Sequence, residues 1–281
     1  MNQLSIEKRT QIVSALVEGC SVRSIVRMTG CSKNTAAKLL VELGAACSNY
    51  MQEKLVNLPC KRVQCDEIWS FVAAKQKNVT PKLAAANPHA GDVWTWVAMD
   101  ADSKLICTWM VGARDWYTAK IFIEDLKSRL ANRVQLTTDG LRIYFHSVAA
   151  AFGDDVDYAA LIKRYGGSVD ESGASARKYS PPECIGCEKK PLIGDPDPKH
   201  VSTSYIERQN LTMRMGMRRF TRLTNAFSKK IENHIASIAI HYMHYNFVRI
   251  HQSLRVTPAM QAGVSDHVWE IEDLVALLQT S

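Results

Sequence analysis

The sequence predicts a mixed α/β fold, in which a sheet carries helices on both faces, preceded by a small helical domain. Runs rich in β-branched and aromatic residues alternate with runs of helical periodicity between residues 61 and 166. That alternation is typical of a sheet covered by helices. The first 46 residues carry helical patterns instead, and 281 residues leave room for both a small and a larger domain.

The chain has an excess of basic residues, with 35 Lys and Arg against 28 Asp and Glu and a formal net charge of +7. Such a charge favours a polyanionic partner such as nucleic acid, although it also suits plain solubility. The eight cysteines are scattered, unlike those of a secreted disulfide scaffold. We see no signal peptide and no window of the ~20 apolar residues that a membrane span needs. We therefore expect a cytoplasmic protein with reduced thiols and no membrane partner.

Three short helices are expected at the N-terminus, over 5–19, 21–30 and 32–44. Each begins at a serine, which can cap the first turn, and ends at a glycine, which tolerates the left-handed exit conformation. Apolar residues at helical spacing fill each segment. Three such helices with tight turns are a helix-turn-helix candidate, so we expect a DNA-binding domain over 1–46 and a linker over 47–60.

The α/β domain is expected over 61–260. Its strands are predicted at 61–74, 92–102, 104–114, 133–140 and, more weakly, 156–166, and the second and third form an antiparallel hairpin. Helices are predicted at 115–132 and 141–153. This order gives a mixed sheet covered on both faces.

Residues 166–203 interrupt this rhythm, because five of the nine prolines fall between 181 and 198. We expect a long loop or insertion there. A basic helix follows over 204–220, then a long helix near 228–247, and 261–281 form a C-terminal segment. One stripe of the long helix has core-facing spacing: Ile231, Ile235, Ile238, Tyr242 and Tyr245.

Three carboxylates stand out by their positions. Asp66 lies inside the first predicted strand, Asp139 at the carboxyl end of the fourth, where α/β sheets place their ligand sites, and Glu207 near the start of the basic helix. Such oxygen ligands suit Mg²⁺ or Mn²⁺, and two ions could activate the attacking oxygen and stabilise the leaving oxygen of a phosphoryl transfer.

Each carboxylate also has a plainer interpretation. Glu67, next to Asp66, could be the inward-facing acid of the strand, and the sequence TTDG around Asp139 is a common turn. Ser204 and Glu207 have the spacing of a capping box, in which the glutamate only satisfies a backbone N–H. Singly, each plain interpretation is favoured over a catalytic one.

Four runs together resemble the DDE transposases of bacterial insertion sequences: DEIWSFV, TTDG, HVSTSYIERQNLTMRMGMRRFTRLTNAFSKK and HYNFVRIHQSLRVTPAM. The resemblance covers residues 61–260, is most specific over 200–260, and is strongest to the group named for the first-numbered insertion sequence. It implies a ribonuclease-H-like core in which Asp66, Asp139 and Glu207 bind the metal ions. It also implies cleavage at the transposon ends followed by attack of the freed 3′-hydroxyl on target DNA.

Basic residues follow Glu207 within the third of these runs. Arg214 follows Glu207 by two helical turns and matches the basic residue that the family carries there, where a cation would grip a phosphate. A DNA-backbone surface is favoured over a merely solvated face for the neighbouring cations, Arg208, Arg218, Arg219 and Arg222.

In a helix-turn-helix the third helix enters the major groove with its N-terminal residues towards the bases. That places Lys33, Asn34, Thr35 and Lys38 forward, with Arg23 and Arg27 available for phosphates. The alternative is a three-helix module that packs against protein. The resemblance implies that this domain binds terminal repeats, and pairing two transposon ends suggests at least a dimer, acting at the bacterial nucleoid.

The cysteines give no complete zinc site. Some relatives carry a zinc-binding cysteine cluster before the helix-turn-helix, whereas this chain has only Cys20 and Cys31 there. Cys184 and Cys187 form a single CxxC pair with His200 as the nearest downstream histidine, which is an incomplete ligand set. The histidines of the long helix are interpreted as packing or surface residues: His234, His241 and His244.

Two other functions compete with transposition. A regulator that only binds DNA would need no metal and would leave DNA uncut. A metal-dependent nuclease of the same fold would cut DNA without joining it.

Overall fold

A computed structural model describes residues 4–166, 184–221 and 225–279. A six-stranded sheet with the order β3-β2-β1-β4-β5-β6 forms its centre. The strands are β1 (Arg62–Val72), β2 (Gly91–Asp100), β3 (Ile106–Gly112), β4 (Gln135–Asp139), β5 (Asp157–Tyr165) and β6 (Cys184–Ile193). The first three strands form an antiparallel meander, β1, β4 and β5 run parallel, and β6 returns antiparallel to β5.

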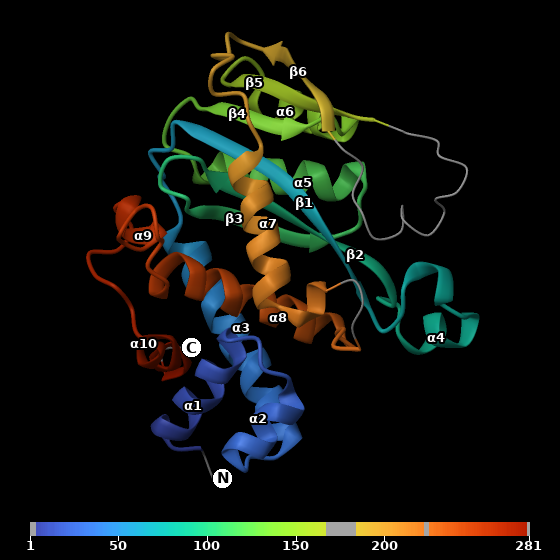
Figure 1. Ribbon diagram of the computed structural model, residues 1–281, viewed down its shortest axis with the longest axis vertical. Helices are drawn as coiled ribbons and strands as arrows, with labels where there is room; N and C mark the ends of the chain where they lie inside the picture. Colours follow the sequence, from blue (N-terminus) through green and yellow to red (C-terminus); the bar gives the residue numbers. More distant parts are fainter. Residues whose placement is uncertain (1–3, 167–183, 222–224, 280–281) are drawn as a thin grey trace.

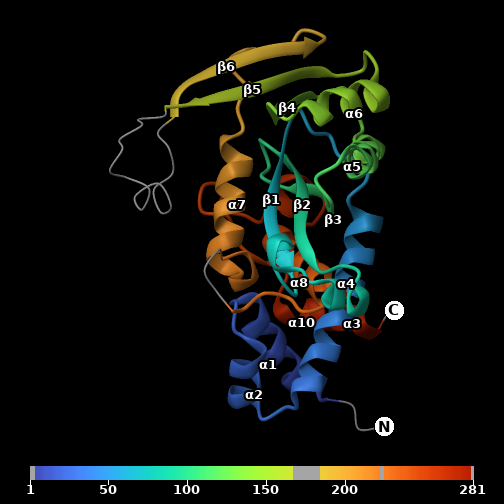
Figure 2. The same cartoon turned by 90° about the vertical axis from the view of Figure 1, so that its right-hand side faces the viewer.

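Helices cover both faces of this sheet. Helix α5 (Trp116–Arg129) and helix α6 (Arg142–Phe152) lie on one face, and helix α7 (Ser204–Gly216) crosses the other (Figures 1 and 2). This arrangement confirms the predicted mixed α/β fold, in which a mixed sheet is covered by helices on both faces. The hairpin of β2 and β3, the strands β4 and β5, and the helices α5 and α6 all lie where the sequence predicted them.

The prediction of a long loop or insertion over 166–203 is wrong for residues 184–193, which form a strand. Strand β6 pairs along nearly the whole of β5 and forms one edge of the sheet. Its central residues Glu188, Lys189, Lys190 and Pro191 are charged or lack a backbone donor, which an edge strand tolerates because one side needs no partner. This composition hid the strand. Residues 167–183 lie outside the described part of the chain.

The N-terminal residues form α1 (Ile6–Val17), α2 (Val22–Thr29) and α3 (Lys33–Lys54). The three predicted serine caps are present, and each serine hydroxyl accepts from the backbone N–H three residues later. Gly30 ends α2 in the left-handed conformation with φ 69°. The predicted helix starts and the first two helix ends are therefore correct.

Gly44 does not end the third helix as predicted. Helix α3 continues to Lys54 and packs closely on α8 (Ile231–Met243). A Cβ atom added at Gly44 would lie 2.4 Å from the Cα of Ala236 on α8. The glycine therefore permits a close helix crossing and does not mark the end of a helix.

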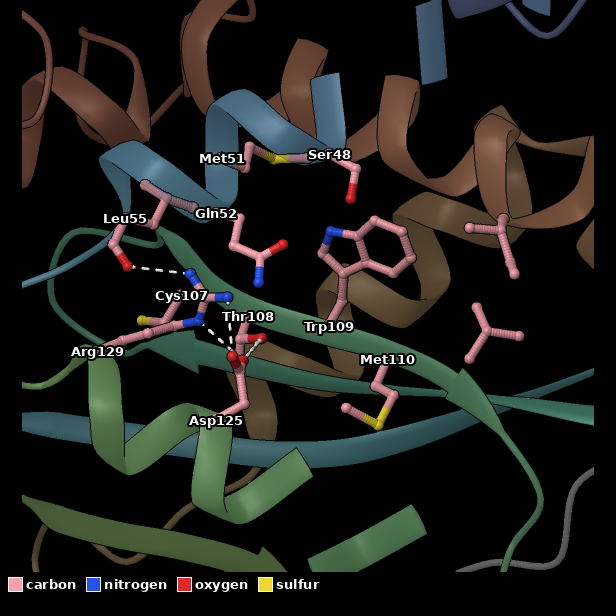
Figure 3. Close-up of a pocket in the computed structure, with 12 residues that line it drawn as sticks. Ser48, Met51, Gln52, Leu55, Cys107, Thr108, Trp109, Met110, Asp125 and Arg129 are labelled. Atoms are coloured by element: carbon pink, nitrogen blue, oxygen red, sulfur yellow. Dashed lines mark hydrogen bonds and ion pairs between the residues drawn. The ribbon is translucent and has the colours of Figure 1, made fainter. Parts of the chain in front are cut away.

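The stretch expected as a linker packs against the sheet. Met51, Leu55 and Leu58 are buried. Beside them a pocket of about 260 Å³ lies between α3, β3 and α5 (Figure 3). Arg129 of α5 donates to Asp125 at 2.8 and 2.9 Å and to the Leu55 carbonyl at 3.1 Å, and these bonds fasten the end of α3 to the core.

The elements after residue 230 pack around α3. Helix α8 continues through a π-helical turn (His244–Val248) to α9 (Pro258–Gln261) and α10 (Ile271–Ala276). Of the stripe predicted to face the core, Ile238, Tyr242 and Tyr245 are buried, but Ile235 is 38% exposed and Ile231 is half-buried. Ile235 instead lines the pocket between α3, β3 and α5.

Short elements complete the chain: 3₁₀ turns at Gln76–Asn78, Arg218–Phe220 and Leu277–Gln279, and the helix α4 (Pro81–Ala86). None of the helices in the described ranges is long and apolar enough to cross a membrane.

Candidate active site

The two faces of β1 carry different chemistry, because successive side chains of a strand point to opposite faces. Gln64, Asp66 and Ser70 face α7 and α8. The Gln64 Oε1 atom accepts from the backbone N–H groups of Tyr205 and Ile206 at 3.0 and 3.1 Å. These bonds satisfy the first turn of α7 and hold its start against the centre of the sheet.

Asp66 and Asp139 come together because β1 and β4 are neighbouring parallel strands. Gln64 of β1 pairs with Thr137 of β4. Asp66 comes two residues after Gln64, and Asp139 comes two residues after Thr137. The two carboxylates therefore lie side by side on the same face. Asp66, Glu67 and Asp139 each have a carboxylate oxygen within 4.8 Å of the others.

Glu67 is the more deeply buried acid of β1, with 7% of its surface exposed. Arg114 Nε donates to Glu67 Oε1 at 2.6 Å, and the Tyr144 hydroxyl of α6 donates to Oε2 at 3.0 Å. The guanidinium of Arg114 also stacks over Trp94, 4.7 Å from the ring centroid. Glu67 is thus the inward acid considered in the sequence, held on the α6 face, whereas Asp66 faces α7.

The clustered carboxylates repel one another. Burial, as the largest cause, and the charges of Glu67, Asp139 and Glu207 together raise the pKa of Asp66 to about 7. Burial and Asp139 also raise the pKa of Glu67, against the opposing effect of Arg114. A site in which several acids raise one another's pKa favours a bound cation.

Glu207 sits in the first turn of α7, above the same face. Its Oε1 accepts from the Thr203 hydroxyl at 2.5 Å and from the ammonium of Lys163 on β5. Glu207 does not belong to the group of three acids whose oxygens lie within 4.8 Å of one another in the described chain. The predicted capping box is absent: Thr203 and not Ser204 is the N-cap residue, and its side chain makes no capping hydrogen bond in the described part of the chain. Gln64 bonds to the N–H groups of the first turn instead, and Glu207 is bound to Lys163.

Asn210 joins α7 to the carboxylates and was not predicted. Its Nδ2 atom donates to Asp66 Oδ2 at 2.8 Å, while its buried Oδ1 atom has no hydrogen-bond partner among the described residues. Asn210 follows Glu207 by three residues, which places both on one helix face. That spacing was a readable signal. Lys163, Arg114 and Tyr144 come from three other elements, and nothing in the sequence links them to the acids.

The donor set fits Mg²⁺ or Mn²⁺. These ions prefer carboxylate oxygens and keep several waters, and a free Asn210 carbonyl oxygen beside Asp66 can accept a hydrogen bond from such a water. The acids close enough together to hold a cation are Asp66, Glu67 and Asp139, whereas Glu207 is paired with Lys163.

The basic residues after Glu207 differ in accessibility. Arg208 and Arg218 are exposed and Arg214 is half-buried. Arg219 points inward and donates to the Ser228 hydroxyl at 2.7 Å, and burial lowers its pKa. Arg219 therefore supports the loop before α8 and offers less to a ligand than its neighbours. Arg222 lies outside the described residues.

At the start of α3, Lys33, Asn34 and Lys38 are exposed, and Lys38 lies 3.5 Å from Glu42. Thr35 is half-buried, and its backbone N–H and hydroxyl are both bonded to Ser32. Three of the four predicted base-reading side chains therefore point to solvent, and Thr35 takes part in the helix cap.

The thiols of Cys184 and Cys187 lie 3.8 Å apart on β6. Neither belongs to a group of three or more metal-ligating side chains within the described ranges. His200 instead contacts Arg62 and lies 3.7 Å from Asp197. The predicted CxxC pair is thus assembled, but His200 has other partners. Buried His234 is a packing residue as predicted, bonded to the hydroxyls of Ser70 and Ser228 at 3.0 and 3.1 Å.

No protein-family model matches the sequence, and a comparison with curated proteins finds no match. Among solved structures, the chain is similar to a piggyBac transposase synaptic complex with hairpin DNA, with a TM-score of 0.44, 9% identity, and coverage of 97% of this chain and 69% of that one. It is also similar to a Mos1 strand transfer complex, with a TM-score of 0.24, 10% identity, and coverage of 86% and 76% of the two chains.

Proposed function

We propose that this protein is a DDE-type DNA transposase that cleaves DNA at transposon ends and joins the freed 3′-hydroxyl to target DNA. The observation that carries the proposal is the convergence of Asp66 and Asp139 from neighbouring parallel strands, with Glu207 on a helix above the same face. The motifs around these three residues are those that resemble the bacterial insertion-sequence group.

Asp66, Asp139 and Glu207 are the proposed ligands of Mg²⁺ or Mn²⁺. Bound there, such ions would supply an activated attacking oxygen and stabilise the leaving oxygen of a phosphodiester. Asn210 orients Asp66 through its amide N–H. Lys163 holds the Glu207 carboxylate when no cation is bound. Arg114 and Tyr144 donate hydrogen bonds to Glu67 and stabilise its ionised form.

DNA is the proposed partner at two surfaces. Arg208, Arg214 and Arg218 follow Glu207 on or just after α7, where cations would contact the phosphates next to the scissile bond. Residues 1–46 are the proposed reader of the terminal repeats, with Lys33, Asn34 and Lys38 towards the bases. Residues 47–60 then join this domain to the catalytic domain over 61–260. A pair of transposon ends would engage at least a dimer, at the bacterial nucleoid.

The decisive assay incubates the protein with Mg²⁺, a pre-cut transposon end bearing a 3′-hydroxyl, and a supercoiled plasmid. A transposase yields joined product, a nuclease yields only nicked plasmid, and a regulator yields neither. We expect joining, and we expect Asp66→Asn, Asp139→Asn and Glu207→Gln each to lower it by about 10²–10³-fold. End binding in a gel-shift assay should survive all three changes. Loss of binding together with chemistry would indicate misfolding.

The reader surface has its own test. The double variant Asn34→Ala, Lys38→Ala should weaken binding to the transposon end by about 10–100-fold without changing joining at saturating DNA. The matched control is Glu42→Gln, which removes the ion-pair partner of Lys38 but leaves both proposed base contacts in place. Unchanged affinity in the double variant would contradict the assignment of this surface.

A further inference from the structure

The edge strand β6 presents two thiols side by side. Cys184 and Cys187 are exposed, and their sulfur atoms are 3.8 Å apart. Residues three apart on a regular strand point to opposite faces, so this meeting needs an explanation. In the pairing with β5, Tyr165 lies opposite Cys184 and Arg164 opposite Gly186, which leaves Ile185 as an extra residue. The resulting bulge shifts the alternation by one residue and turns both thiols to the same side.

A second cysteine pair serves as an internal comparison. Cys60 and Cys107 are also 3.8 Å apart, but they are only 5% and 0% exposed within the core. The two pairs share a sulfur–sulfur distance and differ in access. Thiol–disulfide exchange requires a reagent to reach a sulfur atom, so only the β6 pair is open to it.

The β6 pair also lies next to the carboxylate site. Cys187 is the cross-strand partner of Lys163, and cross-strand partners project from the same face of a sheet. Lys163 in turn binds Glu207. The Lys163 side chain therefore links the position of the exposed thiols to the Glu207 carboxylate.

We propose that Cys184 and Cys187 are a redox-modification site that closes reversibly into an intramolecular disulfide by exchange with a low-molecular-weight disulfide. The thiolate of one cysteine attacks the reagent and releases one thiol. The second cysteine then loses its proton, attacks the mixed disulfide and releases the other thiol. The chain loses two hydrogen atoms, and the reagent is reduced to two thiols. This chemistry does not depend on the proposed transposase activity.

Oxidised glutathione is the probe, applied to the native full-length protein before alkylation with iodoacetamide, proteolysis and mass spectrometry. We expect a peptide in which Cys184 and Cys187 resist alkylation and are together lighter by two hydrogen atoms, with alkylation restored by dithiothreitol. Cys60 and Cys107 should be oxidised at least about tenfold more slowly. Cys184→Ser and Cys187→Ser should each trap one glutathione on the remaining cysteine, whereas the control Cys20→Ser should still form the disulfide.

Three results would overturn the proposal. The first is full alkylation of both β6 cysteines after treatment with oxidised glutathione. The second is a stable glutathione adduct on each of them in the parent chain, because closure would then have failed. The third is equally fast oxidation of the Cys60 and Cys107 pair in the folded protein, because access would then not select the site.

Discussion

Asn210 donates a 2.8 Å hydrogen bond to Asp66, and it does so from one helix turn beyond Glu207. One face of α7 thus carries both a proposed metal ligand and the group that orients another. The start of that helix is itself bound to β1 through Gln64. Strand and helix therefore position the carboxylates as a unit.

We expect Asn210→Ala to lower strand joining by about 10–100-fold, because Asp66 loses the donor that fixes its orientation. End binding should not change. The matched control is Thr212→Ala on the same helix, whose hydroxyl bonds to the Arg208 carbonyl. A positioning role also predicts that Asn210→Asp, which keeps the shape but lacks the donor, fails to restore joining. Full activity in Asn210→Ala would refute this role.

Lys163 provides a test of whether Glu207 binds metal. Its ammonium competes with a cation for the Glu207 carboxylate, so Lys163→Met should tighten Mn²⁺ binding by about two- to tenfold. Isothermal titration calorimetry measures the change. Adding Glu207→Gln to this variant should remove the gain. If Lys163→Met tightens binding equally with Gln at position 207, Glu207 is not the residue released.

Mn²⁺ affinity should depend on pH. Because burial and neighbouring acids raise the pKa of Asp66 to about 7, this carboxyl is mostly protonated below pH 7 and ionised above it. The cation must displace that proton, so affinity should fall by up to about tenfold per pH unit below pH 7 and level off above it. Electron paramagnetic resonance of free Mn²⁺ follows the binding. Asp66→Asn should bind weakly with a flatter profile, and a flat profile in the parent would contradict the assignment.

Gly44→Ala should destabilise the protein by about 1–3 kcal/mol, since the new methyl group would meet the backbone of Ala236 and force α3 and α8 apart. This cost exceeds the helix propensity gained from alanine, about 1 kcal/mol. Urea unfolding measures the free energy. Gly216→Ala is the matched control, since its added Cβ would meet only His241 Cε1 at 3.9 Å. Equal stability of the two variants would show that the helix crossing can relax.

Much of the site was readable because its acids sit at positions that geometry constrains. A strand that ends in an aspartate, next to a parallel strand with an aspartate in its middle, predicts proximity once the two strands are paired. The start of α7 carried the third acid in a family-like motif. These features are local, and the convergence of Asp66 and Asp139 follows from them.

What escaped prediction depends on contacts between distant segments. Gly44 looks like a helix end until Ala236, almost 200 residues later, is packed against it. Strand β6 has too many charges to look like a strand, and only its pairing with β5 reveals it. The ion pair of Glu207 likewise depends on Lys163, which lies on β5. Tertiary contacts override local patterns at each of these positions.

The uninterrupted course of α3 has a mechanical consequence. Its 22 residues make a rod of about 33 Å, whose tip carries Lys33 and Asn34 and whose root is clamped by Arg129 beside Leu55. A duplex bound at the N-terminal end of α3 would therefore be held at a fixed distance from the carboxylates. The base pairs recognised and the bond cut would then be separated by a constant number of nucleotides.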